Sequence, residues 1–403
     1  MRKNIVLSAF ACDPSKGSEP GYGWNWATEL ANNGYTVHCF TRIVGKDEIA
    51  KRSIPENLIF HYVSLPLGGE KLYSSSMAGM YLYYIIWQWI AYRKAKTLHR
   101  QLDFNLAHHV TWGSLQLGSF MYKLGIPFVF GPAGGGQVAP VAFKQYFLNY
   151  WSSEKKREKI SSLMLRFNPA CKMMLRKAYA VLVSNDDTRN MAIKAGASNV
   201  ILTLDVALSK DFFPNNVVLK QVSTERLKLL WVGRFLPRKG ILLLLDVMKE
   251  LKAYPGITLT VVGDGEMKDV FLAKLNDYKL DGTVEWKGKV PFSSINEYYK
   301  NHDAFLFTSL RESGGVQLVE AMAFSLPVIC LNLHGQAQIV NNTIGLLCAC
   351  PDPETAIREL KKGILDFYNN RDLVIEKGQA AHDFAIQQTW DNKIREIVGF
   401  YPR

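Results

Sequence analysis

Two glutamates and a pair of glycines lie close together in the stretch RESGGVQLVEAMAFSLPV. Seven residues separate Glu312 from Glu320, and Gly314 and Gly315 lie between them, where a helix should begin. A helix N-terminus offers unpaired N–H groups and a partial positive charge, and glycines let an anion approach the backbone. We therefore predict that Gly314, Gly315 and Val316 donate amides to a phosphate or a sugar hydroxyl. Glu320 would accept hydrogen bonds from a ribose and Glu312 from a second sugar, unless both are ordinary helix and surface charges.

A second stretch, GRFLPRKG, combines glycines with cations after a strand-like run. Gly233 permits a tight turn, and Arg234 and Lys239 flank the predicted start of a helix. Two fixed cations beside a helix N-terminus suit a diphosphate better than any single anion. Surface solubility is the alternative, but it does not explain glycines at both edges. The pattern G-x-x-x-x-G-K-[ST] is absent, so this is not a phosphate loop of the Walker type.

The loop CDPSKGSEPGYGWNWATEL follows the first strand-like run, at the position of the phosphate loop in a Rossmann domain. Gly21 and Gly23 give this loop conformational freedom, although G-x-G-x-x-G is not present. The second strand-like run, TVHCFTRIVG, has no acid at its end, which argues against NAD. The loop is therefore a weaker indication of a ligand than the two stretches above.

Two adjacent histidines and three successive glycines end further strand-like runs. His108 and His109 close FNLAHHV, where they would face a ligand, although a structural role suits them equally well. Gly134 to Gly136 follow PFVFGP and suit either backbone contact with a ligand or a hinge between domains. No metal is demanded, because D-x-D is absent and Gly263 in GDGE is interpreted first as part of a turn. Cationic side chains and helix N-termini would stabilise a departing diphosphate without Mg²⁺.

Short β-like runs alternate with longer helical segments, and this order positions the candidate residues. Apolar runs with little alternation are typical of strands buried on both faces, and the βαβ order indicates parallel sheets with ligands at the strand C-termini. The alternation restarts near residue 228, after an irregular segment at 205–226 that we interpret as a linker. We predict an α/β protein with two Rossmann-like domains facing each other across a cleft, residues 1–205 and 206–387. A C-terminal helix at about 388–403 would pack back on the first domain.

Length and composition agree with two globular domains. The chain has 403 residues, of which 48% are hydrophobic and 21% charged. Six scattered cysteines form neither a C-x-x-C pair nor a zinc pattern, which suits reduced thiols in the cytoplasm. The start MRKNIVLSAFACDP imitates a signal peptide, but we interpret it as a first strand. The longest apolar stretch, Met77 to Tyr92, has 16 residues, so a buried or membrane-surface helix is expected rather than a crossing.

Positive charge is concentrated in the first half of the chain. The net charge is +12, and the densest part, 141–180, holds nine Lys or Arg and two Glu. It is interleaved with aromatic residues: Phe143, Tyr146, Phe147, Tyr150 and Trp151. This mixture suits an anionic membrane surface, and it also suits nucleic acid or a solvated helical face. We favour peripheral association with the inner face of the plasma membrane and expect no nucleic acid partner.

Taken together, these motifs resemble the family 4 retaining glycosyltransferases, which have the GT-B fold. GRFLPRKG and ESGGVQLVEAMAFSLPVI are similar to the two motifs of that family's second domain. GSEPGYGW, HHVTWGS and GPAGGG are similar to a subgroup linked to bacterial surface polysaccharides. The resemblance implies that Arg234 and Lys239 hold the donor diphosphate and that Lys289 and Val290 border the base. Gly233 and Gly263 would lie on the same donor side.

The resemblance also implies that Glu320 binds the ribose and Glu312 the transferred sugar. From the first domain, Gly21 or Gly23 would approach the phosphate, and His108 or His109 would contact the donor sugar; the alignment leaves each pair open. Two segments depart from the family pattern, TLDVALSKDFF after the linker strand and LHGQAQIV after the second motif.

The function that the resemblance implies is transfer of a sugar from a nucleotide diphosphate, UDP in preference to GDP, with retention at the anomeric carbon. The acceptor would be a glycan, lipid-linked because of the basic segment, in surface polysaccharide biosynthesis. A metal cofactor is not expected. A UDP-sugar 2-epimerase is an alternative, although the extra acids needed for proton transfer are not evident. A non-catalytic nucleotide-sugar-binding partner and a nucleic acid binder are the others.

Overall fold

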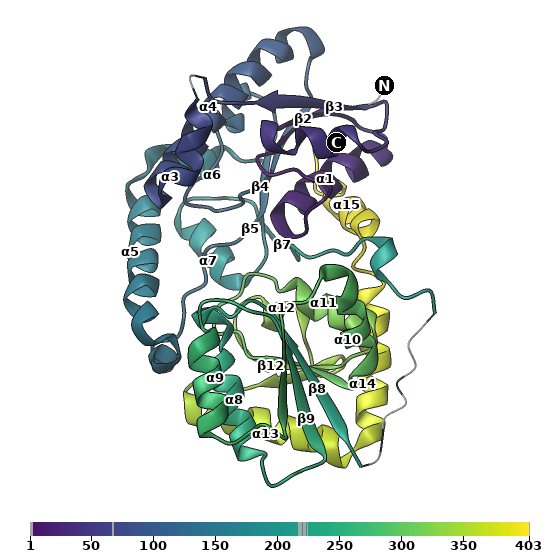
Figure 1. Ribbon diagram of the computed structural model, residues 1–403. Helices are drawn as coiled ribbons and strands as arrows, with labels where there is room; N and C mark the ends of the chain where they lie inside the picture. The colour runs from purple at the N-terminus through teal and green to yellow at the C-terminus, as the bar shows by residue number, and fades with distance from the viewer. Residues whose placement is uncertain (1–2, 67, 217–219, 221–222, 224, 403) are drawn as a thin grey trace. The chain divides into compact units, whose positions relative to one another are not determined.

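The computed structural model describes residues 3–402 except 67, 217–219, 221–222 and 224, and it divides into two compact units (Figure 1). Unit 1 comprises Met1–Gly136, Lys159–Asp205 and Trp390–Arg403, and unit 2 comprises Gln137–Glu158 and Val206–Thr389. A boundary between units therefore falls at residue 205, where the predicted linker begins. Six positions of that linker, within 217–224, lie outside the described residues.

Unit 1 is built on a seven-stranded parallel sheet in the order β3-β2-β1-β4-β5-β6-β7. The strands are β1 (Asn4–Ala9), β2 (Thr36–Arg42), β3 (Leu58–Val63), β4 (Leu106–Thr111), β5 (Phe128–Ala133), β6 (Ala180–Val183) and β7 (Val200–Leu202). The helices are α1 (Ser18–Asn32), α2 (Lys46–Ala50), α3 (Leu72–Ser75), α4 (Met77–Leu102), α6 (Pro169–Lys177), α7 (Asp186–Lys194) and α15 (Trp390–Val398). Helix α15 packs on α1, so the predicted return of the C-terminal segment to the first unit is confirmed.

The long apolar stretch of the sequence forms the first half of α4. Tyr83, Tyr84 and Trp87 are fully buried, and their rings pack edge-on against Phe10 at the end of β1. The opposite side of α4 is exposed. No helix among the described residues is long and apolar enough to cross a membrane, in agreement with the expectation for this stretch.

Unit 2 is built on a six-stranded parallel sheet in the order β10-β9-β8-β11-β12-β13. The strands are β8 (Leu227–Val232), β9 (Ile257–Val262), β10 (Val284–Gly288), β11 (Ala304–Phe307), β12 (Val328–Leu331) and β13 (Gly345–Cys348). The helices are α8 (Ile241–Glu250), α9 (Lys268–Asp277), α10 (Ile295–Asn301), α11 (Val316–Ala323), α12 (Gln336–Ile339), α13 (Pro353–Asn369) and α14 (Arg371–Ala385). Helices α8, α9 and α13 cover one face of this sheet, and α11 and α14 pack together on the other (Figure 1).

Residues 137–158 belong to unit 2, whereas we predicted them in the first domain. This segment contains a 3₁₀ stretch, η4 (Val141–Tyr150), and the beginning of α5 (Trp151–Phe167). Phe143, Tyr146 and Phe147 are buried in the hydrophobic core of unit 2, and the Tyr146 hydroxyl donates to Asp246 over 2.9 Å. Burial of three aromatic side chains gives the segment its place in unit 2. These three rings are consequently not available to a membrane surface, contrary to our interpretation of the aromatic residues in 141–180.

Candidate functional site

Two loops meet at the point where the strand order of unit 2 reverses. Strands β8 and β11 are parallel neighbours at the centre of the sheet, and helices on opposite faces follow them. In open α/β sheets, ligands bind outside the carboxyl ends of the strands at such a reversal. The two stretches singled out in the sequence, GRFLPRKG and RESGG, form these two loops.

The loops are held together by backbone contacts on either side of Lys239. The Thr308 hydroxyl donates to the Lys239 carbonyl over 3.1 Å, and the Leu310 N–H donates to the Arg238 carbonyl over 2.8 Å. Gly240 has a φ of +65°, and a Cβ built there would lie 2.1 Å from the Thr308 carbonyl oxygen. Only glycine suits this position, which ends the short turn η6 (Pro237–Lys239) and begins α8.

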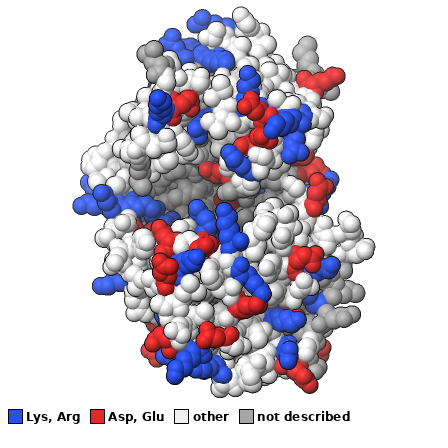
Figure 2. Space-filling model, in the orientation of Figure 1, with Lys and Arg blue, Asp and Glu red and all other residues white. Residues whose placement is uncertain are grey.

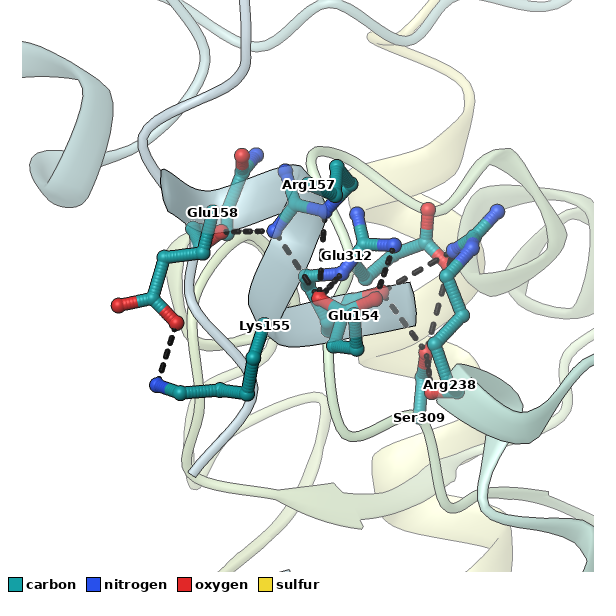
Figure 3. Close-up of polar contacts among 9 residues, drawn as sticks. Glu154, Lys155, Arg157, Glu158, Arg238, Ser309 and Glu312 are labelled. Carbon is teal, nitrogen blue, oxygen red and sulfur yellow. Dashed lines mark hydrogen bonds and ion pairs between the residues drawn. The ribbon is translucent and has the colours of Figure 1, made fainter. Parts of the chain in front are cut away.

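The carboxylate of Glu312 is the centre of a buried charge cluster (Figure 3). Its Oε2 accepts hydrogen bonds from Lys239 Nζ, from Arg238 Nη1 over 3.2 Å and from the Ser309 hydroxyl over 3.4 Å. The Glu312 side chain is 13% exposed and that of Lys239 8%. Burial would raise the pKa of Glu312, but the two cations lower it to about 2. Burial and the neighbouring Arg238 and Arg234 lower the pKa of Lys239, although Glu312 opposes this.

A second layer of charges supports the loop from the 137–158 segment. Arg311 Nε forms an ion pair with Glu154 Oε1 over 2.7 Å, and its Nη2 donates to Glu154 Oε2 over 3.1 Å. Arg157 pairs with the same carboxylate over 3.0 Å (Figure 3). Burial lowers the pKa of Arg311 to about 10. Glu154 therefore fixes the residue that precedes Glu312, through a bidentate contact with well-defined geometry.

Helix α11 begins at Val316, as predicted, and brings Glu320 to the same place. Gly314 and Gly315 are buried, and Gly315, with a φ of +95°, precedes the first helical residue. The first N–H groups of a helix have no partner inside it. Glu320 is 8% exposed and accepts a hydrogen bond from the Tyr299 hydroxyl over 2.9 Å. Burial raises its pKa to about 7, while Tyr299 and the Lys239 charge oppose the increase.

The remaining predicted residues of unit 2 lie at the same edge of the sheet. Gly263, after β9, donates its N–H to the Gly288 carbonyl at the end of β10, and the Gly233 N–H bonds to the carbonyl end of β9. A Cβ on Gly263 would lie 1.8 Å from the Gly233 carbonyl oxygen, so this turn also requires glycine. Lys289 follows β10 and is exposed, and Val290 is half-buried. Arg234 is exposed, but it is close enough to Lys239 to affect that side chain electrostatically.

In unit 1, Gly21 and Gly23 lie inside a helix, not in a loop as we expected. Helix α1 begins at Ser18, and both glycines are buried. A Cβ would lie 2.3 Å from the Lys16 carbonyl oxygen at Gly21 and 1.9 Å from that of Ala11 at Gly23. These glycines let the helix pack closely on the loop before it. Their predicted approach to a phosphate stays a prediction.

His108 and His109 are fully buried at the end of β4. His108 uses both ring nitrogens: Nε2 donates to the Gly131 carbonyl and Nδ1 accepts from the Tyr401 hydroxyl, each over 2.7 Å. His109 contacts the Ser8 hydroxyl over 3.0 Å and the Tyr84 hydroxyl over 3.2 Å. Burial lowers the pKa of each to about 3, so both are neutral imidazoles. Contact of either with a sugar stays a prediction. The boundary between units follows Gly136, the last of the three successive glycines.

Sequence reasoning missed Arg238, Glu154 and Tyr299. Arg238 lies in the same PRK turn as Lys239, and a turn of three residues does not indicate which cation points inward. Glu154 is 158 positions away from Glu312, so no local signal connects them. Among the described residues, no group of three or more His, Cys, Asp or Glu is arranged to hold a metal ion. All six cysteines are free and buried.

Comparison with known proteins identifies the type of domain. Residues 218–381 match the family "Glycosyl transferases group 1". The chain is 28% identical over 189 residues to a phosphatidylinositol N-acetylglucosaminyltransferase of Arabidopsis thaliana, covering 46% of this chain and 41% of the relative. It is 34% identical over 116 residues to the amylovoran biosynthesis glycosyltransferase AmsD of Erwinia amylovora, covering 28% and 32%. The chain thus spans less than half the length of these curated relatives.

Solved structures resemble the whole chain. Sucrose-phosphate synthase from Thermosynechococcus elongatus has a TM-score of 0.66 at 18% identity, with 99% of this chain and 98% of that chain covered. Anabaena HepE in complex with UDP and glucose has a TM-score of 0.62 at 15% identity, with 99% and 100% covered. At these identities the likeness concerns the fold. With its two parallel-sheet units the chain has the GT-B fold, and residues 218–381 carry a glycosyl transferases group 1 domain.

Proposed function

We propose that this protein is a retaining glycosyltransferase that uses a nucleotide-diphosphate sugar, UDP in preference to GDP. The observation that carries the proposal is the cluster at the strand reversal of unit 2, where Glu312, Lys239 and Arg238 lie beside the N-terminus of α11 and near Glu320. A glycosyl transferases group 1 domain and a solved neighbour with bound UDP and glucose support the same class of donor.

Each group of the cluster has a chemical task in this proposal. Lys239 and Arg238, together with the exposed Arg234, attract the diphosphate, which also lies against the N–H groups of Gly314 to Val316. Glu320 accepts hydrogen bonds from the ribose hydroxyls, and Glu312 accepts them from the transferred sugar. Because Lys239 and Arg238 already neutralise Glu312, the Glu312 carboxylate stays ionised when the sugar arrives.

The transfer itself would proceed by front-face substitution. The bond between the anomeric carbon and the diphosphate oxygen breaks, and an acceptor hydroxyl forms the new bond from the same side. The acceptor's proton passes to the departing diphosphate, whose charge the cations and helix N-terminus stabilise without a metal. Gly21 or Gly23 and His108 or His109 would complete the site from unit 1.

We propose a glycan acceptor on a lipid carrier, made in the cytoplasm for a surface polysaccharide. AmsD, named for amylovoran biosynthesis, supports the choice of polysaccharide biosynthesis. The free, buried cysteines suit the reducing compartment.

Thermal shift with UDP-, GDP- and ADP-sugars, followed by product analysis, tests the donor. Wild type should be stabilised by UDP-sugars and should transfer or slowly hydrolyse them, whereas Lys239→Ala should lose both effects. Lys361→Ala, which breaks only a distant surface pair with Glu250, is the matched control. A product epimerised at C2 from donor alone would indicate the epimerase, and binding without turnover would indicate a non-catalytic partner.

A further inference from the structure

Two helices of unit 1 carry exposed apolar side chains at the same spacing. Each row follows the i, i+3, i+7 pattern that puts side chains on one helical face: Leu82, Ile85 and Trp89 on α4, and Ile160, Leu163 and Phe167 on the part of α5 that belongs to this unit. These six side chains, which we call the apolar rows, are 40–68% exposed. Soluble helices normally turn such a face inward, so two outward rows indicate an interaction surface.

The apolar rows flank one hollow. A pocket of about 150 Å³ is lined by Ile85 and Gln88 from α4 and by Met164 and Asn168 from α5 and the residue after it. Ile85 belongs to the first row, and Met164 is the neighbour of Leu163 in the second. The remaining lining is mainly apolar and comes from the start of α6 and the loop at 117–120. The two rows therefore form one continuous face with a pocket between them.

The same two segments carry positive charge without any acid. Residues 77–102 and 159–185 contain no Asp or Glu, and their cations are Arg93, Lys94, Lys96, Arg100, Lys159, Arg166, Lys172, Arg176 and Lys177. Lys and Arg side chains reach the left edge of the view in Figure 2, where α5 lies in Figure 1. Lys123 adds a further cation, 5.7 Å from the centre of the Trp89 ring.

We propose that the apolar rows dock on an anionic lipid surface, with these cations contacting the headgroups. Apolar side chains on one face, a Trp at its border and cations without acids suit the interfacial region of a bilayer. The pocket lies on this face and can admit the end of an aliphatic chain. The proposal rests on the proposed function in one respect, because it gives a lipid-linked acceptor the surface from which it is presented.

Flotation with vesicles tests this face in the absence of any donor. Wild type should float with phosphatidylcholine vesicles that contain one third phosphatidylglycerol and should bind pure phosphatidylcholine much less. Leu163→Ser/Phe167→Ser should weaken binding at least about tenfold, because two exposed apolar side chains no longer enter the bilayer. Lys159→Gln/Arg166→Gln should weaken it about 25-fold, or about fivefold per cation, and only on anionic vesicles.

A control variant of equal chemistry is available in unit 2. Phe292 and Ile375 are 67% and 46% exposed, against 68% and 43% for Phe167 and Leu163. Phe292→Ser/Ile375→Ser should float like wild type. Thermal melting and the UDP-sugar shift of the Leu163/Phe167 variant should equal those of wild type, so that loss of flotation is separate from failure of donor binding.

Three outcomes would overturn the proposal. Wild type could stay unbound, it could float equally well with both kinds of vesicle, or Leu163→Ser/Phe167→Ser could float like wild type. Analytical ultracentrifugation adds a fourth. A dimer that this variant dissociates, without vesicle binding by wild type, would show that a second copy covers the face.

Discussion

Replacing Glu312 by Gln tests whether the buried charge cluster contributes to stability as the structure implies. Gln keeps the shape of Glu312 but leaves Lys239 buried without its counter-charge. Breaking a buried pair by removing one partner is strongly destabilising, because the remaining charge is no longer compensated. We therefore expect Glu312→Gln to destabilise unit 2 while leaving unit 1 unaffected.

The pKa of Glu312 provides the magnitude and its dependence on pH. The ordinary value is 4.5 and the folded value about 2, a difference that corresponds to about 3.4 kcal/mol. Since the folded pKa is the lower one, this stability is fully present above pH 4.5 and is lost as pH falls through about 2. The difference between wild type and Glu312→Gln should be about 3.4 kcal/mol at pH 7 and about 1.4 kcal/mol at pH 3.

Hydrogen exchange at increasing urea concentration measures this free energy for each unit separately. Peptides from β8 and α11 report on unit 2, and peptides from β1 and β4 provide the internal control in unit 1. Glu285→Gln, which removes an exposed partner of Lys287, is the matched variant and should change nothing measurable. A loss below about 1 kcal/mol for Glu312→Gln at pH 7, or a loss that does not shrink toward pH 3, would refute the reasoning.

Three further predictions concern the same unit. Burial raises the pKa of Glu320 to about 7, so the affinity for a UDP-sugar should increase several-fold between pH 6 and pH 8 as the carboxylate ionises; calorimetry should find this dependence absent in Glu320→Gln. Glu154→Gln removes the partner of Arg311, and exchange of the 308–316 amides should become at least tenfold faster with little change elsewhere in unit 2. Gly240→Ala should cost more than about 1 kcal/mol in urea unfolding, because its φ is +65° and Thr308 is in the way, whereas Gly282→Ala, with open space around it, should be nearly neutral.

The strands were predictable because buried parallel strands are short apolar runs. TVHCFTR corresponds residue by residue to β2, and MRKNIVLSAFACDP contains β1. FNLAHHV and PFVFGP cover β4 and β5 except for the last residue of each strand. The start of α1 was less predictable. Glycines usually indicate a loop, but here they permit close packing of a helix, and the carbonyl groups that exclude a Cβ are not visible in the sequence.

The candidate site was predictable as far as it is local. GRFLPRKG and RESGG are each continuous in sequence, and the βαβ order places both at strand C-termini. Glu154 was not predictable in this way. It reaches Arg311 only because Phe143 and Phe147 are buried in the core of unit 2 and carry the segment before α5 with them. That packing is a tertiary fact, and neither charge nor periodicity indicates it.

The segment at 141–180 shows why composition alone does not locate a surface. Its basic and aromatic residues suggest one membrane patch, but the aromatic rings near residue 145 are core residues of unit 2. The exposed apolar side chains are Ile160, Leu163 and Phe167, on the helix that follows. Their spacing would suit a buried stripe equally well, because a helix has the same period whether its apolar face is covered or open. What distinguishes the two cases is the neighbouring helix, and α4 turns a second apolar row outward beside the same pocket.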